Sequence, residues 1–295
     1  MFHCFALEPS AFRSQIVGAR GVGWRPGQPV GLHDEVHWRS REGLSSGVFK
    51  HEGPARTARK NEILAGYLAG VAGFVNSGGF VLIGSFTSHV TGSIGRSSVD
   101  LAHGVGSASA FAALLVVTFF AGAFVASLVV ESSLFRRTSR AYCAALVVEG
   151  SLLAAFIFIA GLTRATGPRE LDAEASMLCF AMGMQNSLVT RLSGAVVRTT
   201  HLTGIVTDLA IEASRWWRWQ RVRLLPQLSL SSTRNPPVRP LPAKIILLGT
   251  IVATFAIGSF IGAVAVLHAS RWAMGFPAAA IFAASIYAFL EKEPS

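Results

Sequence analysis

Charged residues are scarce in this chain. Only 14% of its 295 residues are charged and 51% are hydrophobic, whereas a soluble globular domain is about 25% charged. This composition excludes an ordinary soluble domain of this length. It predicts an integral membrane protein whose main partner is the lipid bilayer.

Cysteine is rare as well. Cys4, Cys143 and Cys179 are widely separated, which excludes a disulfide framework and the spacing of a zinc site. Four histidines of the first 60 residues also lack ligand spacing. The sequence contains neither a phosphate-binding loop nor a dinucleotide fingerprint, so we expect no cofactor and no metal.

Acidic residues are fewer than basic ones, 16 against 26, and the formal net charge is +10. The basic residues lie at the ends of apolar runs and in the N-terminal region. This distribution is typical of cytoplasmic loops facing anionic lipid. We therefore expect no nucleic-acid partner.

One motif occurs twice. Residues 73–92 read GFVNSGGFVLIGSFTSHVTG, and residues 183–204 read GMQNSLVTRLSGAVVRTTHLTG. Both contain Gly-x-x-Asn-Ser followed by a hydroxyl residue, His, an aliphatic residue, Thr and Gly. An Asp-Leu-Ala follows each copy, beginning at Asp100 and at Asp208. So many matches in one order indicate an internal duplication.

The apolar runs predict six transmembrane helices, since a span needs roughly 20 apolar residues. The predicted spans are 63–86, 111–130, 141–162, 175–197, 245–268 and 272–290. The repeat divides them three and three. Because three is odd, the second half begins on the opposite side of the membrane, which predicts an all-α fold of two inverted three-helix repeats.

The same pattern sets the domain organisation. The expected segments are a disordered basic tail (1–60), the first three-helix repeat (61–165), the first helix of the second repeat with its motif (174–211), a basic Trp- and Pro-rich cytoplasmic loop (212–243), and the last two helices (244–295). Small residues four apart, such as Gly66 with Gly70, Gly122 with Ala126, and Gly258 with Gly262, predict close helix packing.

The distribution of Lys and Arg among the loops predicts how the chain is oriented in the membrane. The loops after the second and fourth spans are the basic ones, with residues Arg136, Arg137, Arg140, Arg215, Arg218, Arg221, Arg223, Arg234, Arg239 and Lys244. The alternate loops hold few basic residues. Both termini are therefore predicted to be cytoplasmic.

The repeated segments are expected to interrupt helices. Gly78-Gly79 and Ser193-Gly194 would weaken a helix, and polar residues follow in each copy. Backbone without helical hydrogen bonds persists at membrane depth where it is buried in protein or lines a wet cavity. In inverted-repeat transporters the substrate binds at such breaks.

The two segments resemble the YoaK-like family of bacterial multi-pass membrane proteins (domain of unknown function 1275). The resemblance is carried by Phe86-Thr-Ser-His-Val-Thr-Gly-Ser, Gly183-Met-Gln-Asn and Arg198-Thr-Thr-His-Leu-Thr-Gly, and extends from about residue 60 to the C-terminus. Two positions differ: Asn76 stands where the family usually has an acid, and Ser93 where it has Asn. The resemblance implies a fold and a bacterial inner-membrane location but no activity.

The motif polar residues are the predicted substrate site. They are Asn76, Ser77, His89, Thr91, Gln185, Asn186, Ser187, His201 and Thr203. If the halves meet there, the two Asn-Ser pairs should approach each other near mid-depth, because amides in hydrocarbon need partners. The alternative for Thr91 and Thr203 is helix N-capping. The histidines either relay protons or belong to the capping turn.

Few ionisable residues lie inside the spans. Glu149 and Arg191 are expected to pair, since a charge at bilayer depth costs roughly 2.5–3.5 kcal/mol. Either they form an inert ion pair, or Glu149 binds a proton or a cationic group. Asp208 is a further coupling candidate.

Ser88 beside His89, with Asp100 downstream, invites comparison with a hydrolase. Adjacent residues seldom point at each other, and no nucleophile elbow is present, so we expect no enzyme.

The sequence favours a secondary transporter of an unidentified small molecule. A channel of similar layout and a non-transporting scaffold are the alternatives. The substrate, the coupling ion and any homo-oligomer do not follow from the sequence.

Overall fold

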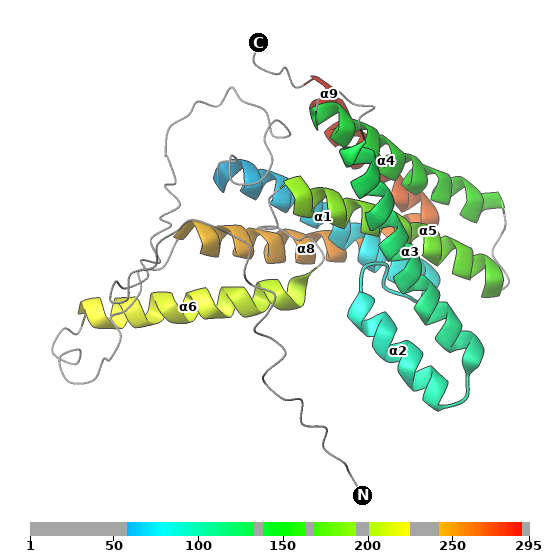
Figure 1. The fold of residues 1–295 in the computed structure, drawn as a ribbon, viewed down its shortest axis with the longest axis horizontal. Helices are drawn as coiled ribbons and strands as arrows, with labels where there is room; N and C mark the ends of the chain where they lie inside the picture. The colour runs from blue at the N-terminus through cyan, green and yellow to red at the C-terminus, as the bar shows by residue number, and fades with distance from the viewer. Residues whose placement is uncertain (1–57, 133–137, 163–167, 193–200, 225–241, 291–295) are drawn as a thin grey trace, which may run out of the picture. The chain divides into compact units, whose positions relative to one another are not determined.

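The structure is a computed structural model, and it describes residues 58–132, 138–162, 168–192, 201–224 and 242–290. Within these ranges every regular element is helical and no strand occurs, as Figure 1 shows. The predicted all-α class is confirmed. Nearly all of the expected tail, residues 1–57, lies outside the described residues.

The helices follow in the order α1 (Ala58–Ile83), α2 (Val90–Ala102), α3 (Gly106–Glu131), α4 (Thr138–Leu162), α5 (Pro168–Leu192), α6 (Leu202–Leu224), α8 (Pro242–Ala269), the 3₁₀ turn η2 (Ser270–Met274) and α9 (Gly275–Leu290). Two of them, α2 and α6, follow the two motifs. Helix α6 continues to Leu224, where the sequence predicted a loop from residue 212. Its Trp, Arg and Gln residues are all compatible with a helix.

Four helical stretches are long and apolar enough to cross a membrane. They are Glu62–Ile83, Gly106–Glu131, Ser139–Ile159 and Pro242–Leu290. The last is 49 residues long and contains both α8 and α9. Helix α5 is not among them, because Gln185, Asn186 and Arg191 lower the hydropathy of its second half and four charged residues occupy its start. Six separate crossings therefore stay a prediction.

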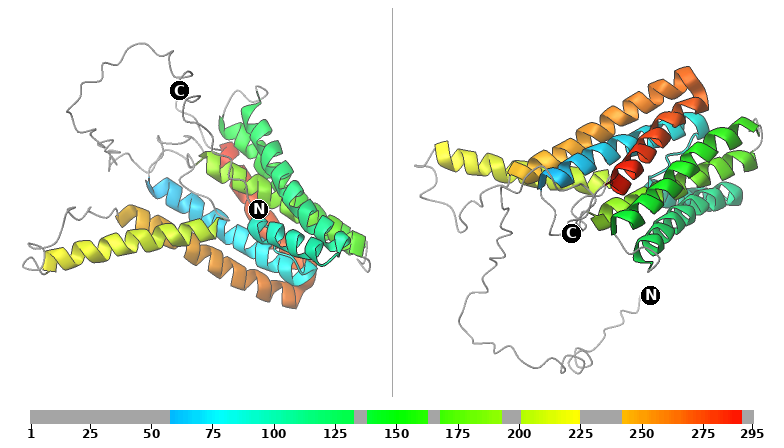
Figure 2. Two further views of the ribbon diagram at one scale, coloured as in Figure 1. Left: turned by 60° about the horizontal axis from the view of Figure 1, so that its bottom comes forward. Right: turned by 90° about the horizontal axis from the view of Figure 1, so that it is seen from above.

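The chain reverses between α8 and α9. Ser270, the first residue of the 3₁₀ turn η2, has a φ of 51°, in the left-handed region. Helix α8 has 28 residues, about 42 Å of helix. Helix α9 then packs against α4 instead of α8, with Cys143 Sγ 3.3 Å from Ser285 Oγ. Figure 2 shows the two helices on either side of α1.

Glycine brings two pairs of helices into backbone contact. A Cβ atom at Gly73 of α1 would overlap the Phe255 carbonyl oxygen of α8. In the same way, a Cβ atom at Gly183 of α5 would overlap the Phe119 carbonyl oxygen of α3. These are equivalent contacts, because Gly73 and Gly183 occupy the same motif position. The prediction that small residues serve helix packing is confirmed at these helices.

A second contact fixes the direction and register of each pair. A Cβ atom at Gly258 would overlap the Gly70 carbonyl oxygen, and one at Gly262 would overlap the Phe74 carbonyl oxygen. Residue numbers therefore rise together along the two helices, so α1 and α8 run parallel. A Cβ atom at Gly122 would overlap the Phe180 carbonyl oxygen, and further along the same helices Ser127 contacts Ser187 and Glu131 contacts Arg191, so α3 and α5 also run parallel. By these contacts Gly122 corresponds to Gly258. Residues 120–123 (Phe-Ala-Gly-Ala) and 260–263 (Phe-Ile-Gly-Ala) are similar in sequence, but this match pairs Gly122 with Gly262, one helical turn from its spatial counterpart Gly258.

Helices α1 and α5 run antiparallel. Gln185 Nε2 donates to the Leu68 carbonyl oxygen at 2.9 Å, and a Cβ atom at Gly79 would lie 3.3 Å from Leu178 Cδ1. From the first contact to the second, residue numbers rise along α1 and fall along α5. The two first helices of the repeat thus cross in opposite directions at the centre of the buried core.

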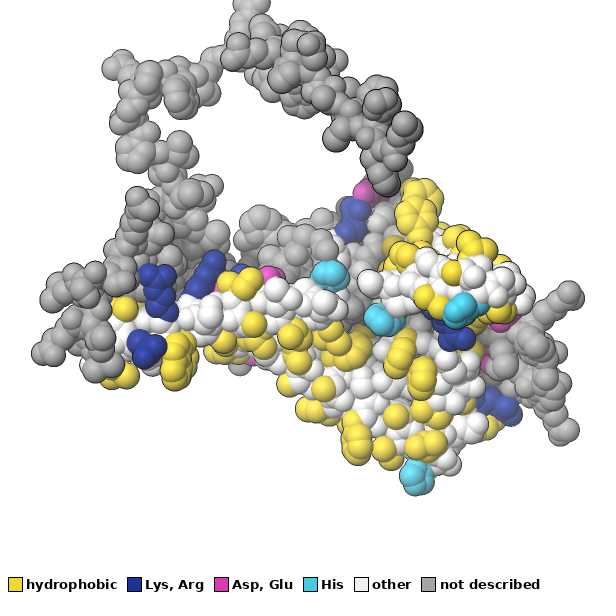
Figure 3. Space-filling model, turned by 90° about the horizontal axis from the view of Figure 1, so that it is seen from below, with side chains coloured by type: hydrophobic (Ala, Val, Ile, Leu, Met, Phe, Trp, Pro, Cys, Tyr) yellow, Lys and Arg dark blue, Asp and Glu magenta, His cyan; other side chains and the backbone are white. Residues whose placement is uncertain are grey.

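Large apolar side chains remain exposed on the outer faces of the bundle, as Figure 3 shows for one side. Phe120 on α3 and Phe260 on α8 are 68% and 72% exposed. Exposed apolar surface of this extent is costly in water. These helices are those of a membrane-embedded protein.

Candidate functional site

The first motif closes a break between α1 and α2. Helix α1 passes through Gly78-Gly79, where the sequence predicted weakening, and ends at Ile83. Gly84 has a φ of 73°, and non-helical residues continue to His89. Asn76 Oδ1 accepts hydrogen bonds from Ser88 N at 3.1 Å and Ser88 Oγ at 3.0 Å. The Asn76 side chain, near the end of α1, thus fixes the motif loop that follows this helix.

Histidine, not threonine, begins the helix after each motif. His89 is the N-cap residue of α2 without a side-chain cap bond, and its carbonyl accepts from Ser93 N at 3.0 Å. The His201 carbonyl accepts from Ile205 N at 3.1 Å. Thr91 and Thr203 lie inside the helices, so the predicted threonine N-caps are wrong.

The glycine of each motif makes room for that histidine. A Cβ atom at Gly92 would overlap the His89 ring, and one at Gly204 would lie 2.5 Å from His201 Cδ2. Helical residues three apart share a face, so the ring covers the first turn. The spacing His-x-x-Gly is the sequence signal for this arrangement. Both histidines are exposed.

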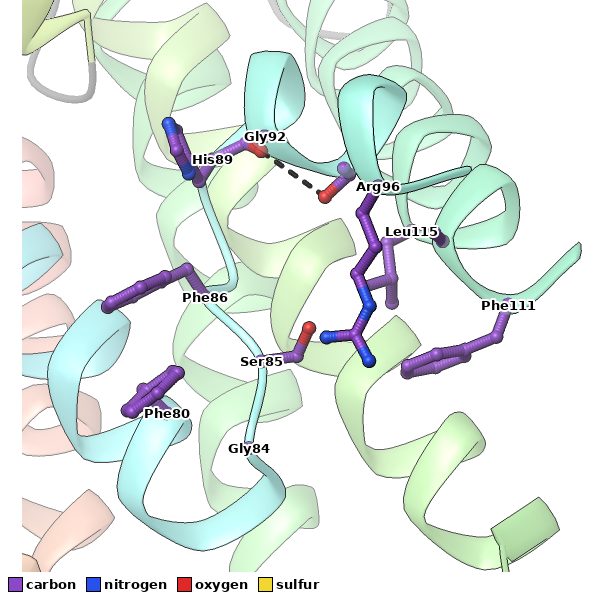
Figure 4. A pocket seen from close by; sticks show the side chains of 11 residues that line it. Phe80, Gly84, Ser85, Phe86, His89, Gly92, Arg96, Phe111 and Leu115 are labelled. Atoms are coloured by element: carbon purple, nitrogen blue, oxygen red, sulfur yellow. Dashed lines mark hydrogen bonds between the residues drawn. The ribbon is translucent and has the colours of Figure 1, made fainter. Parts of the chain in front are cut away.

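A pocket of about 220 Å³ lies between the end of α1, the motif loop, α2 and α3. Figure 4 shows its lining. Its polar residues are Ser85, His89, Ser93 and Arg96, and its apolar residues are Phe80, Phe86, Phe111, Ala112 and Leu115. The Arg96 guanidinium points toward Ser85 and Phe111, whereas the His89 ring points away from it.

Neighbouring contacts hold the pocket wall. Arg96 Nε lies 3.5 Å from Asp100 Oδ2, one turn along α2. Ser97 and Ser109 fasten α2 to α3, with Ser109 Oγ donating to the Ser97 carbonyl at 2.8 Å and Ser97 Oγ to the Ser109 carbonyl at 3.0 Å. Arg96 was not among the site residues predicted from the sequence. Its signal was its place on the helix after the first motif, four residues before Asp100.

The predicted meeting of the two Asn-Ser pairs stays a prediction. Asn76 accepts both of its described hydrogen bonds from Ser88 in its own motif loop. Ser187 instead shares a hydrogen bond of 2.9 Å with Ser127 of α3.

Glu149 and Arg191 do not pair, and that prediction is wrong. Arg191 Nη1 lies 2.6 Å from Glu131 Oε1, because both residues occupy the last turn of parallel neighbours α5 and α3. Glu149 is the twelfth of the 25 residues of α4 and is completely buried. Neither of its carboxyl oxygens has a hydrogen-bond partner among the described residues.

A buried acid outside the predicted site joins α6 to α8. Glu212 Oε1 lies 2.8 Å from Arg215 Nη1 and 2.9 Å from Lys244 Nζ. Its side chain is 4% exposed. The sequence signal was a single acid one turn before the arginines of α6. Asp208, the predicted coupling residue one turn earlier, is exposed.

The comparisons with known proteins identify the family. A family described as Protein of unknown function (DUF1275) matches residues 64–287. The chain belongs to this family. The match begins in α1 and ends in α9, so it covers the bundle and both motifs. No curated protein and no solved structure matches the chain.

The described residues do not form a metal centre. No group of three or more His, Cys, Asp or Glu side chains within them could hold a metal ion. His3, His33, His37 and His51 lie outside the described residues. Cys143 and Cys179 are free thiols.

Proposed function

We propose that this DUF1275 protein is a secondary transporter of a small solute, coupled to protons through Glu149. The observation that carries the proposal is the position of Glu149, completely buried at the middle of α4 with both carboxyl oxygens unpartnered among the described residues. A carboxyl group in such surroundings is functional more often than structural, because it contributes no interaction that stabilises the fold.

The energetics of Glu149 favour proton exchange over a fixed charge. A carboxylate without a partner in an apolar interior is strongly disfavoured, so this conformation suits the neutral, protonated acid. Ionisation needs water, a cation or a basic substrate group to reach Glu149. A conformational change that opens α4 to one side of the membrane would release the proton there. The described conformation is then the proton-loaded one.

The architecture supports alternating access. We infer six crossings arranged as two inverted halves, with the chain in a bacterial inner membrane and both termini cytoplasmic. The antiparallel crossing of α1 and α5 and the matching glycine contacts of α1–α8 and α3–α5 support this arrangement. Inverted halves can exchange conformations, which exposes one central site to each side in turn.

Transport is favoured over catalysis by the contacts of Ser88. Its hydroxyl donates to Asn76, and the His89 ring lies over Gly92. The serine and the histidine are thus engaged with different partners. This supports a structural role for Ser88 and no nucleophile at the motif.

The proposal can be tested with Glu149→Gln and a matched control. A metabolite library is first screened for compounds that raise the melting temperature of the purified protein, because ligands of the folded state stabilise it. Uptake of each such compound into proteoliposomes is then measured with and without a pH gradient. Asp172→Asn, which removes a carboxylate near the start of α5 and before the predicted span, is the control.

We expect the gradient to stimulate uptake by the unsubstituted protein and by Asp172→Asn, and to have no effect on Glu149→Gln. Glutamine keeps the size of the side chain but cannot exchange a proton. Gradient-stimulated uptake by Glu149→Gln would disprove the role of Glu149. Uptake that does not saturate would indicate a channel, and no uptake by any variant a scaffold.

A further inference from the structure

We propose that the pocket between α1, α2 and α3 binds a small organic carboxylate, with the Arg96 guanidinium as its anion-binding group. That this ligand is also the transported solute rests on the proposed function. Binding itself depends only on the pocket.

The charge of the pocket favours an anion. Among its described lining residues there is an arginine, a histidine and two serines, and there is no acid. Asp100 lies behind Arg96, 3.5 Å from its Nε atom. The terminal nitrogens of the guanidinium remain directed toward Ser85 and Phe111, as Figure 4 shows. Their planar fork matches the two oxygens of a carboxylate.

The remainder of the pocket favours an apolar group beside that carboxylate. Phe80 and Phe86 stack with their ring centroids 4.3 Å apart, and Phe111 and Leu115 come from α3. The volume of about 220 Å³ equals that of about seven water molecules at ~30 Å³ each. The ligand class is therefore a compact carboxylate with an aromatic or aliphatic body.

The ligand can reach Arg96 without a large rearrangement. The Arg96 side chain is 62% exposed, and the loop that lines the pocket is fixed by the bonds between Asn76 and Ser88. A preformed site of this kind limits the ordering cost of binding. Inorganic anions would contact Arg96 but would leave the aromatic walls without a partner.

Binding is tested with benzoate as the probe and the full-length protein in detergent. Benzamide and benzylamine keep the ring and replace the carboxylate by a neutral or a cationic group, and inorganic phosphate keeps an anion without the ring. Phosphatidylglycerol in mixed micelles tests a lipid headgroup at the same arginine. Dissociation constants are obtained from the concentration dependence of the melting temperature.

We expect benzoate alone among these probes to stabilise the protein markedly. Arg96→Gln should weaken benzoate binding by about tenfold or more, since a charge-assisted bidentate contact is lost. Arg140→Gln, which removes an exposed arginine at the start of α4, should leave it unchanged. Stabilisation by benzylamine equal to that by benzoate, or by phosphatidylglycerol alone, would overturn the inference.

Thiol labelling locates the ligand without relying on Arg96→Gln to fold. Ser93→Cys places a thiol in the pocket, and Ser98→Cys places one on the exposed face of the same helix. Benzoate should slow maleimide labelling at position 93 and not at position 98, after subtraction of the native cysteines. Equal rates with and without benzoate at position 93 would exclude this site.

The two proposals fail separately. Benzoate that binds through Arg96 but is not taken up by proteoliposomes would remove the proposed transport and leave the binding site. Uptake that depends on Glu149 but not on Arg96, with no benzoate binding, would do the reverse.

Discussion

Asn76 accepts both hydrogen bonds that Ser88 donates, 3.1 Å from its backbone nitrogen and 3.0 Å from its hydroxyl oxygen. The two residues are twelve positions apart, and between them α1 ends and the loop before α2 begins. The bond thus fixes the loop that forms one wall of the pocket. The same acceptor atom is present in an aspartate, and the family resemblance places an acid at this position.

Replacement of Asn76 tests this role. Asn76→Leu should lower stability by about 1–3 kcal/mol, because the partly buried Ser88 amide then lacks an acceptor. It should also raise the rate of maleimide labelling at Ser85→Cys in the loop. Asn76→Asp keeps the acceptor and should be close to the unsubstituted protein in both measurements. Equal melting temperatures for Asn76→Leu and Asn76→Asp would contradict the proposed role of the amide.

Glycine contacts should govern the stability of the bundle. Gly73→Ala would place a methyl group on the Phe255 backbone, which no rotamer change relieves, and should cost about 1–3 kcal/mol or more. Gly249→Ala on α8 has open space around it and should be neutral or stabilising, since alanine favours helix. Melting temperatures in detergent measure both. A larger loss at Gly249 than at Gly73 would refute the packing assignment.

The histidine turn makes a separate prediction. Gly92→Ala should displace the His89 ring, whereas Gly95→Ala on the same helix meets nothing. The His89 ring resonances in NMR spectra should therefore shift in the first variant and not in the second. If both variants leave the ring resonances in place, the ring does not lie over Gly92 in solution.

Orientation can be measured from positions near the two motif helices. Helix α2 follows α1, and α6 follows the antiparallel α5, so the two begin at opposite ends of the bundle. His103→Cys should react with an impermeant thiol reagent added to intact cells, and Ser214→Cys should not, because the basic segments are predicted to be cytoplasmic. The opposite pattern would reverse the orientation, and reaction of both would contradict the opposite placement of α2 and α6.

The sequence by itself determined the class of the protein and its internal duplication. Scarce charge and long apolar runs require a bilayer, and helices are the local solution because each satisfies its own backbone. The doubled motif predicted the interruption after α1, and glycines four apart predicted close packing. These features depend on composition and on neighbours along the chain, which a sequence displays directly.

Tertiary structure alone decided which side chains meet. Glu149 lacks the arginine expected for it because Arg191 lies at the end of α5 beside Glu131, and Ser187 of the second motif shares a hydrogen bond with Ser127 of α3. Such partners depend on the register and rotation of helices distant in sequence. A displacement of one turn, about 5.4 Å, changes every contact while leaving hydropathy the same.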